Sequence, residues 1–207
     1  MDGKGKIAIA LGAIAVLLWG RKAMAKQIVE MQLSPHFKLS EFLRSTAIPE
    51  VKYYRPNEQE IENLKFLVNE ILEPLRQDFG PIRIVGGVRP NSVRDSQGRN
   101  FTEALKARGY EPSPEGDHTT FNGADIQLVR APFRLDTYKR AVEVLKRNPK
   151  VRQVILYIKT DELTKRPYAS HIHVASVAPG RPSFYATAPD RYAFVNLDGH
   201  RVPEGVA

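Results

Sequence analysis

Apolar residues recur at α-helical spacing over one long segment in the first half of the chain, and the strand-like runs come mainly after it. Asn57, with Glu60 three positions later, predicts the start of this helix, because the two side chains can cap each other's backbone N–H groups. The dipeptide Gly80-Pro81 predicts its end. The apolar positions form one face of the helix and are Ile61, Leu64, Val68, Ile71, Leu72 and Leu75.

Similar patterns predict the other elements. We expect a second helix over Leu135–Arg147 and a brief one capped by Ser40. The segment Pro90–Gly116 is predicted to be a surface excursion that contains one short helix, FTEALKARG. Short apolar runs bounded by polar or Gly/Pro residues predict strands at Ile82–Val85, Asp125–Val129, Val151–Ile158 and His171–Val177. Helices followed by a small sheet predict an α+β domain, with a small antiparallel sheet and flanking helices.

The chain is long enough for one sizeable core and contains no cysteine. It has 207 residues, 42% of them hydrophobic, which suits one compact domain with short appendages. The absence of cysteine excludes disulfides, thiolate metal sites and a cysteine nucleophile. We expect an N-terminal segment at residues 1–27, a domain at 28–178 and a C-terminal extension at 179–207.

The N-terminal segment contains an uncharged apolar run, IAIALGAIAVLLWG, from Ile7 to Gly20. A helix rises about 1.5 Å per residue, so the run falls short of a bilayer core of about 30 Å unless the flanking basic side chains snorkel. One interpretation is a signal peptide cleaved after Ala23-Met24-Ala25, which would give a secreted protein. The other is a retained hydrophobic helix. Arg21 and Lys22 favour it, so we predict a membrane anchor with the domain facing the periplasm or cell wall, or a virion membrane.

The basic composition bears on the partners of the chain. The formal net charge is +8 and the pI about 9.7. Such a balance favours nucleic acid, anionic lipid or anionic cell-wall polymer. The basic residues are scattered, and no common nucleic-acid-binding motif is present. A basic nucleic-acid binder is therefore the weakest interpretation, and we expect no specific nucleic-acid partner.

Two segments carry side chains that can bind a metal ion. GDHTTFNGADIQL contains His118 and Asp125, and SHIHVAS contains His171 and His173. Alternate residues of a strand project from one face, so the imidazoles of His171 and His173 point the same way. Imidazole nitrogen and carboxylate oxygen suit zinc, and a catalytic zinc site has three protein ligands and an open position. His118, Asp125 and His173 supply three such ligands.

Around these residues the chain resembles the superfamily of zinc D-Ala-D-Ala carboxypeptidases and L-alanyl-D-glutamate endopeptidases, which includes phage endolysins and murein endopeptidases. That superfamily shares a Ser-x-His-x-x-Gly-x-Ala-x-Asp type motif, a Ser-Gly-Tyr-Arg type strand end and a late His on a strand. The matching stretches here are GDHTTFNGADI, VGGVRP and HIHVAS, within a resemblance that spans Phe37 to Ser176. The resemblance implies that His118, Asp125 and His173 bind zinc. It also implies that Arg89 contacts the substrate or a developing oxyanion.

Two positions depart from the family pattern. Gly116 stands where the family has serine, and Ser170 stands where many members have the acidic general base. Related murein endopeptidases carry a His-x-His pair, in which the second His binds zinc and the first assists the water or the oxyanion. The resemblance therefore implies a catalytic role for His171, whose imidazole can transfer protons near neutral pH. Asp161 and Glu162 are further candidates for a base.

Together these features predict a zinc metallopeptidase that cuts stem-peptide bonds of bacterial peptidoglycan, as an endopeptidase or carboxypeptidase, with His171 and Arg89 as catalytic residues. A tethered, basic enzyme of this kind suits a phage lysis or virion-associated protein. The alternative is a homologue that keeps the fold and binds peptidoglycan without turnover. Asp117 is predicted to cap or orient the neighbouring ligand, and His36 and His200 have no predicted role.

Overall fold

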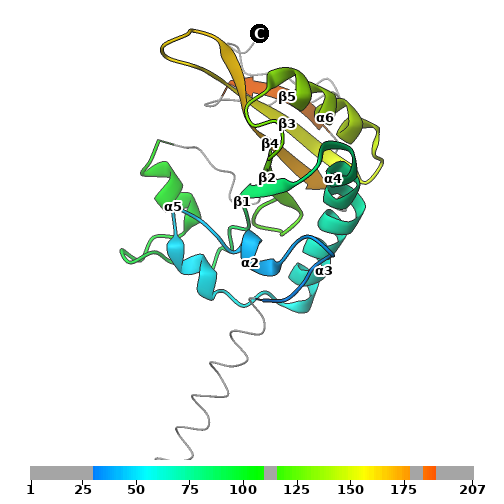
Figure 1. The fold of residues 1–207 in the computed structure, drawn as a ribbon. Helices are drawn as coiled ribbons and strands as arrows, with labels where there is room; N and C mark the ends of the chain where they lie inside the picture. Colours follow the sequence, from blue (N-terminus) through cyan, green and yellow to red (C-terminus); the bar gives the residue numbers. More distant parts are fainter. Residues whose placement is uncertain (1–29, 110–115, 178–183, 190–207) are drawn as a thin grey trace, which may run out of the picture.

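The structure, a computed structural model, describes residues 30–109, 116–177 and 184–189. These residues form a mixture of short helices and one five-stranded sheet (Figure 1). The helical elements are α2 (Leu39–Phe42), η1 (Pro49–Tyr53), α3 (Glu58–Leu67), η2 (Val68–Leu72), α4 (Glu73–Phe79), α5 (Phe101–Lys106) and α6 (Leu135–Arg147). The strands are β1 (Ile82–Gly86), β2 (Gly123–Leu128), β3 (Val151–Thr160), β4 (Pro167–Ser176) and β5 (Phe184–Pro189).

The strands lie in the order β1-β2-β4-β3-β5. The pairs β1–β2, β2–β4 and β4–β3 are antiparallel, which confirms the predicted α+β fold with a small antiparallel sheet. β5 pairs with β3 in parallel, so part of the predicted C-terminal extension joins the same sheet as an edge strand. β4 is the middle strand and is hydrogen-bonded on both sides. The predicted N-terminal hydrophobic helix lies outside the described residues.

The long helix expected between Asn57 and Gly80 is present as α3, η2 and α4 in succession. Asn57 Oδ1 accepts from Glu60 N at 2.9 Å, and Glu60 Oε2 accepts from Asn57 N at 2.8 Å, so the predicted mutual cap is confirmed. The middle turn, η2, is π-helical rather than α-helical. Gly80 ends the helix with φ 80°, a conformation that glycine adopts without steric cost. Five of the six predicted apolar positions are fully buried at 0–1% exposure: Leu64, Val68, Ile71, Leu72 and Leu75.

α6 begins at Leu135 and ends at Arg147, as predicted, and packs against β3 and β4. Its Tyr138 is fully buried, and the phenol oxygen accepts a hydrogen bond of 3.0 Å from the backbone of Leu128. On β4, Ile172 and Val174 enter the hydrophobic core. The alternation of a strand places the residues between and beside them, His171 and His173, on the opposite face.

Two local expectations change. The cap at Ser40 is wrong, because α2 begins at Leu39 and Lys38 is the N-cap residue, whose backbone N–H donates to Glu41 Oε1 at 2.8 Å. The β3–β4 hairpin is longer than predicted and projects from the body of the molecule (Figure 1).

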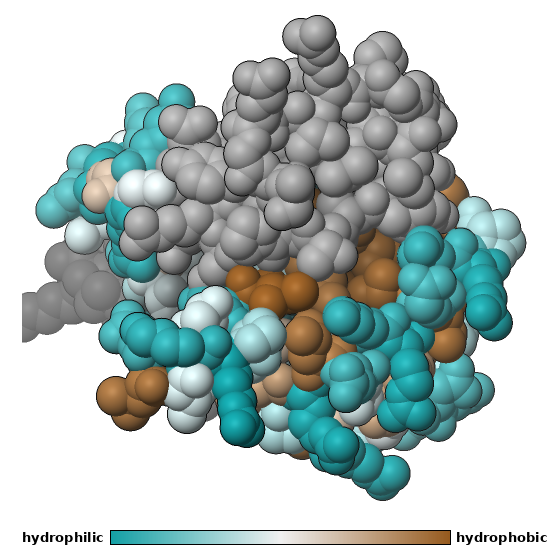
Figure 2. Space-filling model, turned by 90° about the horizontal axis from the view of Figure 1, so that it is seen from above, coloured by the Kyte–Doolittle hydropathy of each residue, from teal (hydrophilic) through white to brown (hydrophobic). Residues whose placement is uncertain are grey.

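The described surface seen in Figure 2 is largely hydrophilic, and apolar residues gather in one area next to the atoms drawn in grey. Within residues 30–109, 116–177 and 184–189, no helix has both the length and the apolar character needed to span a membrane. The predicted anchor or signal segment, residues 1–27, lies outside these ranges.

Candidate metal centre

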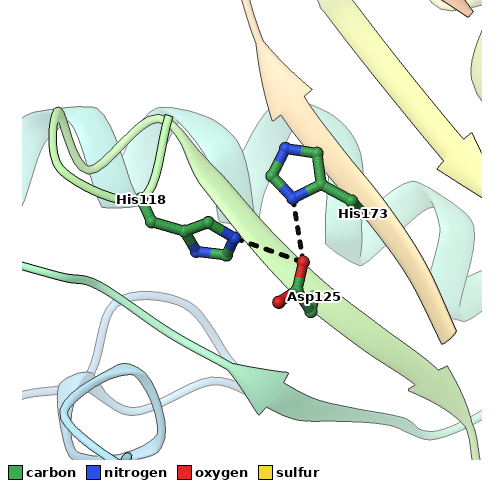
Figure 3. Close-up of side chains that lie close together, drawn as sticks. All are labelled: His118, Asp125 and His173. Carbon is green, nitrogen blue, oxygen red and sulfur yellow. Dashed lines mark hydrogen bonds and ion pairs between the residues drawn. The ribbon is translucent and has the colours of Figure 1, made fainter. Parts of the chain in front are cut away.

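Three of the predicted site residues converge from two strands and a loop (Figure 3). Asp125 lies on β2, and His173 lies opposite it on β4 as its direct cross-strand partner. His118 lies in the turn before β2. Asp125 Oδ1 is 3.2 Å from His118 Nε2 and 2.8 Å from His173 Nδ1. One ligand atom from each of the three residues lies within 4.8 Å of the others, so the cluster can hold a metal ion.

His118 is fixed by the backbone on either side of it. Its Nδ1 lies 2.7 Å from the carbonyl oxygen of Gly87. A carbonyl only accepts, so Nδ1 carries the hydrogen, and the lone pair of Nε2 is directed at Asp125. The carbonyl of His118 in turn accepts from the backbone of Arg89 at 2.9 Å. The VGGVRP stretch thus holds the first ligand in one tautomer.

His173 is held in the opposite tautomer. Its Nδ1 faces Asp125, and its Nε2 lies 3.1 Å from Gln153 Oε1 and 3.6 Å from Asp117 Oδ2. Both outer groups are acceptors, so Nε2 carries a hydrogen, and in the neutral imidazole Nδ1 is available to a metal ion. Metal-binding histidines commonly donate their second ring N–H to such an acceptor, which fixes the ring orientation.

The carboxylate of Asp125 packs against Gly86, which has no side chain. Gly86 on β1 pairs with Asp125 through a register shift of the sheet. A Cβ atom at Gly86 would overlap the Asp125 carboxylate. Gly87 has a similar restriction, because a Cβ atom there would overlap the backbone of Phe42. The two glycines therefore leave room for the carboxylate and bring the Gly87 carbonyl to His118.

The charges around the cluster keep the carboxylate ionised. Burial alone raises the pKa of Asp125, but His118 and His173 in their protonated forms supply charges and hydrogen bonds that outweigh it and hold the pKa well below its ordinary value. Burial and the Arg89 charge lower the pKa of His118, against the opposing effect of Asp125. Burial also lowers the pKa of His173, but Asp117 and Asp125 raise it above its ordinary value. The cluster has one strongly anionic group and two buried imidazoles, which is a suitable donor set for a divalent cation.

Arg89 lies at the margin of the cluster. Its Nη2 atom is 3.5 Å from Asp125 Oδ2, and its side chain is 31% exposed, whereas those of His118 and His173 are 9% and 8% exposed. A guanidinium at the border between buried ligands and solvent can contact a bound anionic group. The structure therefore brings Arg89 to the site.

His171 is close to the cluster without belonging to it. It stacks on Tyr157 of β3, with ring centroids 4.3 Å apart and planes 13° apart, and its Nδ1 is 3.0 Å from Ser170 Oγ. Burial lowers the pKa of His171, and the positive charges of His173, Lys159 and Arg89 add to this against the effect of Asp125. The imidazole is therefore neutral near pH 7 and can accept a proton. Burial and the Asp125 charge raise the pKa of Tyr157 to about 12, so its phenol remains protonated.

The remaining acidic candidates, Asp161, Glu162 and Asp117, lie in different places relative to the cluster. Asp161 lies in the hairpin loop, where its Oδ1 accepts from the backbone of Leu163 at 3.1 Å and of Thr164 at 2.6 Å. It stabilises that turn. Glu162 lies beside it in the same loop, at the projecting end of the hairpin (Figure 1). Asp117 was predicted to cap or orient the neighbouring His118, but its carboxylate instead approaches His173, and its carbonyl accepts from Asn122 and Gly123.

Arg152 and Gln153 were not predicted, although both contact the site from β3. Both are only 5% exposed. The signal available in the sequence is the pair of adjacent polar residues near the start of the otherwise apolar run VRQVILYI, which breaks the expected strand alternation.

Comparisons with known proteins were made for the whole chain, and no family model, no curated protein and no solved structure gave a significant match. The superfamily resemblance therefore remains a prediction from the sequence motifs, and so do the identity of the metal ion and the reaction.

Proposed function

We propose that this protein is a zinc-dependent hydrolase of stem-peptide bonds in bacterial peptidoglycan. The observation that carries the proposal is the convergence of His118, Asp125 and His173, far apart in sequence, on one buried cluster. Two imidazoles and a carboxylate are a donor set typical of catalytic zinc sites. A zinc ion held there would acidify a water molecule and polarise a carbonyl group.

The surrounding residues supply the other requirements of peptide hydrolysis. His171 is neutral, partly exposed and on the face of β4 that carries His173, so it can take a proton from the attacking water and pass it to the leaving amine. Arg89 can bind a substrate carboxylate or stabilise the developing oxyanion. The substrate class rests on the superfamily resemblance, and the net charge of +8 favours an anionic polymer such as cell wall.

The proposal is tested with full-length protein in detergent on purified peptidoglycan. Wild-type protein should release soluble peptide fragments. His118→Ala and chelator treatment should each abolish the release, while the matched variant His36→Ala should retain it. Hydrolysis that persists in both His118→Ala and chelated protein would refute the proposal.

A second measurement examines the proton-transfer role. His171→Gln replaces the imidazole with an amide of similar size that cannot act as a base, so we expect kcat to fall by about 10²-fold or more. Its metal content should equal that of wild type, because His171 is outside the ligand cluster. Wild-type kcat in His171→Gln would assign the proton transfer to another group.

The absence of two family residues favours one alternative, a protein that binds peptidoglycan without cleaving it. Gly116 and Ser170 stand where the family has its serine and its acidic base. That alternative predicts stoichiometric metal and co-sedimentation with purified peptidoglycan, but no released fragments. The two assays of the same preparation distinguish binding from hydrolysis.

A further inference from the structure

A buried polar cluster lies behind the second predicted metal ligand. Gln153 Oε1 is 3.1 Å from His173 Nε2 and also accepts from Arg152 Nη2 at 3.3 Å. A guanidinium can only donate, so the contact with Arg152 identifies this amide atom as the oxygen. Asp117 Oδ2 is 3.6 Å from the same His173 nitrogen.

Arg152 connects the members of this cluster. Its Nη2 donates to Asp117 Oδ2 in a close ion pair, and both side chains are buried, at 6% and 4% exposure. Removing two charges from water is costly and offsets their attraction, so a buried pair alone is poor evidence for a stabilising role. Arg152 also contacts Gln153, and Asp117 lies beside His173. The pair can therefore affect the orientation of a predicted metal ligand as well as the stability of the fold.

An irregularity in the sheet makes the cluster possible. Along β3 the pairing with β4 passes from Val151 directly to Gln153, opposite the adjacent residues Ser176 and Ala175. Arg152 is therefore the extra residue of a β-bulge. In a regular strand Arg152 and Gln153 would point to opposite faces. A bulge re-aims a side chain, and here both residues reach the His173 side of the sheet.

We propose that Asp117, Arg152 and Gln153 are positioning residues that hold His173 with its hydrogen on Nε2 and its Nδ1 directed at the metal ion. Gln153 accepts the Nε2–H hydrogen bond. Asp117 places a negative charge beside the same atom, and Arg152 fixes both acceptors. The inference rests on the metal-binding part of the proposed function and does not depend on the substrate.

Metal binding tests the inference without peptidoglycan. Zn²⁺ affinity is measured by competition with a chromophoric chelator, and the visible spectrum of the Co²⁺ form reports the ligand geometry. Gln153→Met removes the acceptor at similar size, and Asp117→Asn removes the charge at the same shape. Each should weaken Zn²⁺ binding by about 10- to 100-fold and alter the Co²⁺ spectrum.

The matched control is Glu73→Gln, which neutralises another largely buried carboxylate in contact with a histidine, away from the cluster. Its affinity and Co²⁺ spectrum should equal those of wild type. Circular dichroism establishes that each variant is folded, and Gln153→Met serves if Asp117→Asn does not fold.

Three results would overturn the inference. Folded variants with wild-type affinity and spectrum would show that the cluster does not position His173. A loss in Asp117→Asn as complete as that in Asp125→Asn would make Asp117 a direct ligand. A wild-type protein that binds neither Zn²⁺ nor Co²⁺ would remove the metal site itself. Absence of hydrolysis with normal metal binding would overturn only the proposed reaction.

Discussion

Among the described residues, two clusters pair a histidine with a carboxylate at the same distance, and of these two only the one around Asp125 has the features of a metal site. His36 Nδ1 is 2.8 Å from Glu73 Oε2, and His173 Nδ1 is 2.8 Å from Asp125 Oδ1. The His36 side chain is 51% exposed, whereas that of His173 is 8% exposed. A close histidine–carboxylate contact therefore does not by itself identify a functional centre.

The difference lies in what surrounds each carboxylate. Glu73 Oε1 accepts from the hydroxyl of Ser34 at 2.5 Å and from the backbone of His36 at 3.0 Å. These donors hold the loop before α2 against α4. One oxygen of Asp125, in contrast, faces two imidazoles, and the outer nitrogen of each imidazole is held by a protein acceptor. Nitrogen atoms directed at a common point, rather than proximity alone, distinguish the candidate metal centre.

The sharpest test of this contrast neutralises one carboxylate in each cluster at constant shape. Asp125→Asn should lower Zn²⁺ affinity by more than about 100-fold, since even an outer-shell partner contributes about 10- to 100-fold. Glu73→Gln should leave it unchanged. Competition titration measures both. Equal effects of the two variants would remove the distinction between the clusters.

Metal binding should raise the free energy of unfolding through the cluster of His118, Asp125 and His173 and not through the His36–Glu73 cluster. At free metal about 100 times Kd, the free energy of unfolding rises by about 2.7 kcal/mol if the unfolded chain does not bind. For a chain of this size each kcal/mol shifts Tm by about 2–4 °C. Thermal unfolding should show the shift in wild type and in His36→Ala, and no shift in His118→Ala. A metal-induced shift in His118→Ala would place the binding elsewhere.

A smaller effect is expected from the backbone beside the carboxylate. Gly86→Ala adds a methyl group that overlaps the carboxylate of Asp125, so this side chain has to move. We expect an affinity loss of about 10-fold, comparable with the weaker outer-shell substitutions. Competition titration, with circular dichroism as the control for folding, measures it. Wild-type affinity would show that the carboxylate has another position from which it can bind.

The smallest effect concerns the Glu73 cluster. Burial raises the pKa of Glu73, but hydrogen bonds from Ser34 and His36 outweigh it and hold the pKa below its ordinary value of 4.5. A lowered folded-state pKa contributes stability above the ordinary value and loses it as pH falls through the folded-state pKa. Glu73→Gln should therefore be less stable by about 1 kcal/mol at pH 7. The difference should shrink below pH 4.5 in urea unfolding, and a constant difference would contradict this account.

The sequence predicts the parts of the fold that depend on local chemistry. The mutual cap of Asn57 and Glu60, the stop at Gly80 and the limits of α6 are all confirmed, because each depends on residues within a few positions. The grouping of His118, Asp125 and His173 was predicted from their residue types together with the superfamily resemblance, and the structure brings them together.

Long-range features were not predictable in the same way. Whether β5 adds to β3 in parallel depends on pairing between distant segments. The roles of Arg152 and Gln153 depend on a bulge whose register is set by β4. Two adjacent polar residues in an apolar strand indicate a break in the strand alternation, but they do not show which side chains Arg152 and Gln153 will contact. The Ser40 cap failed because Glu41 instead accepts from the backbone of Lys38, so the helix begins earlier.

The central position of β4 in the sheet has a consequence for the removal and rebinding of a metal ion at the candidate site. His173 is anchored in a strand with neighbours on both sides, so its amide should belong to the slowest deuterium-exchanging part of the chain. Removal of a bound metal ion would then leave the backbone around the three ligands folded, and rebinding would require only side-chain adjustment. An apoprotein of this kind can take up metal without first having to refold around it.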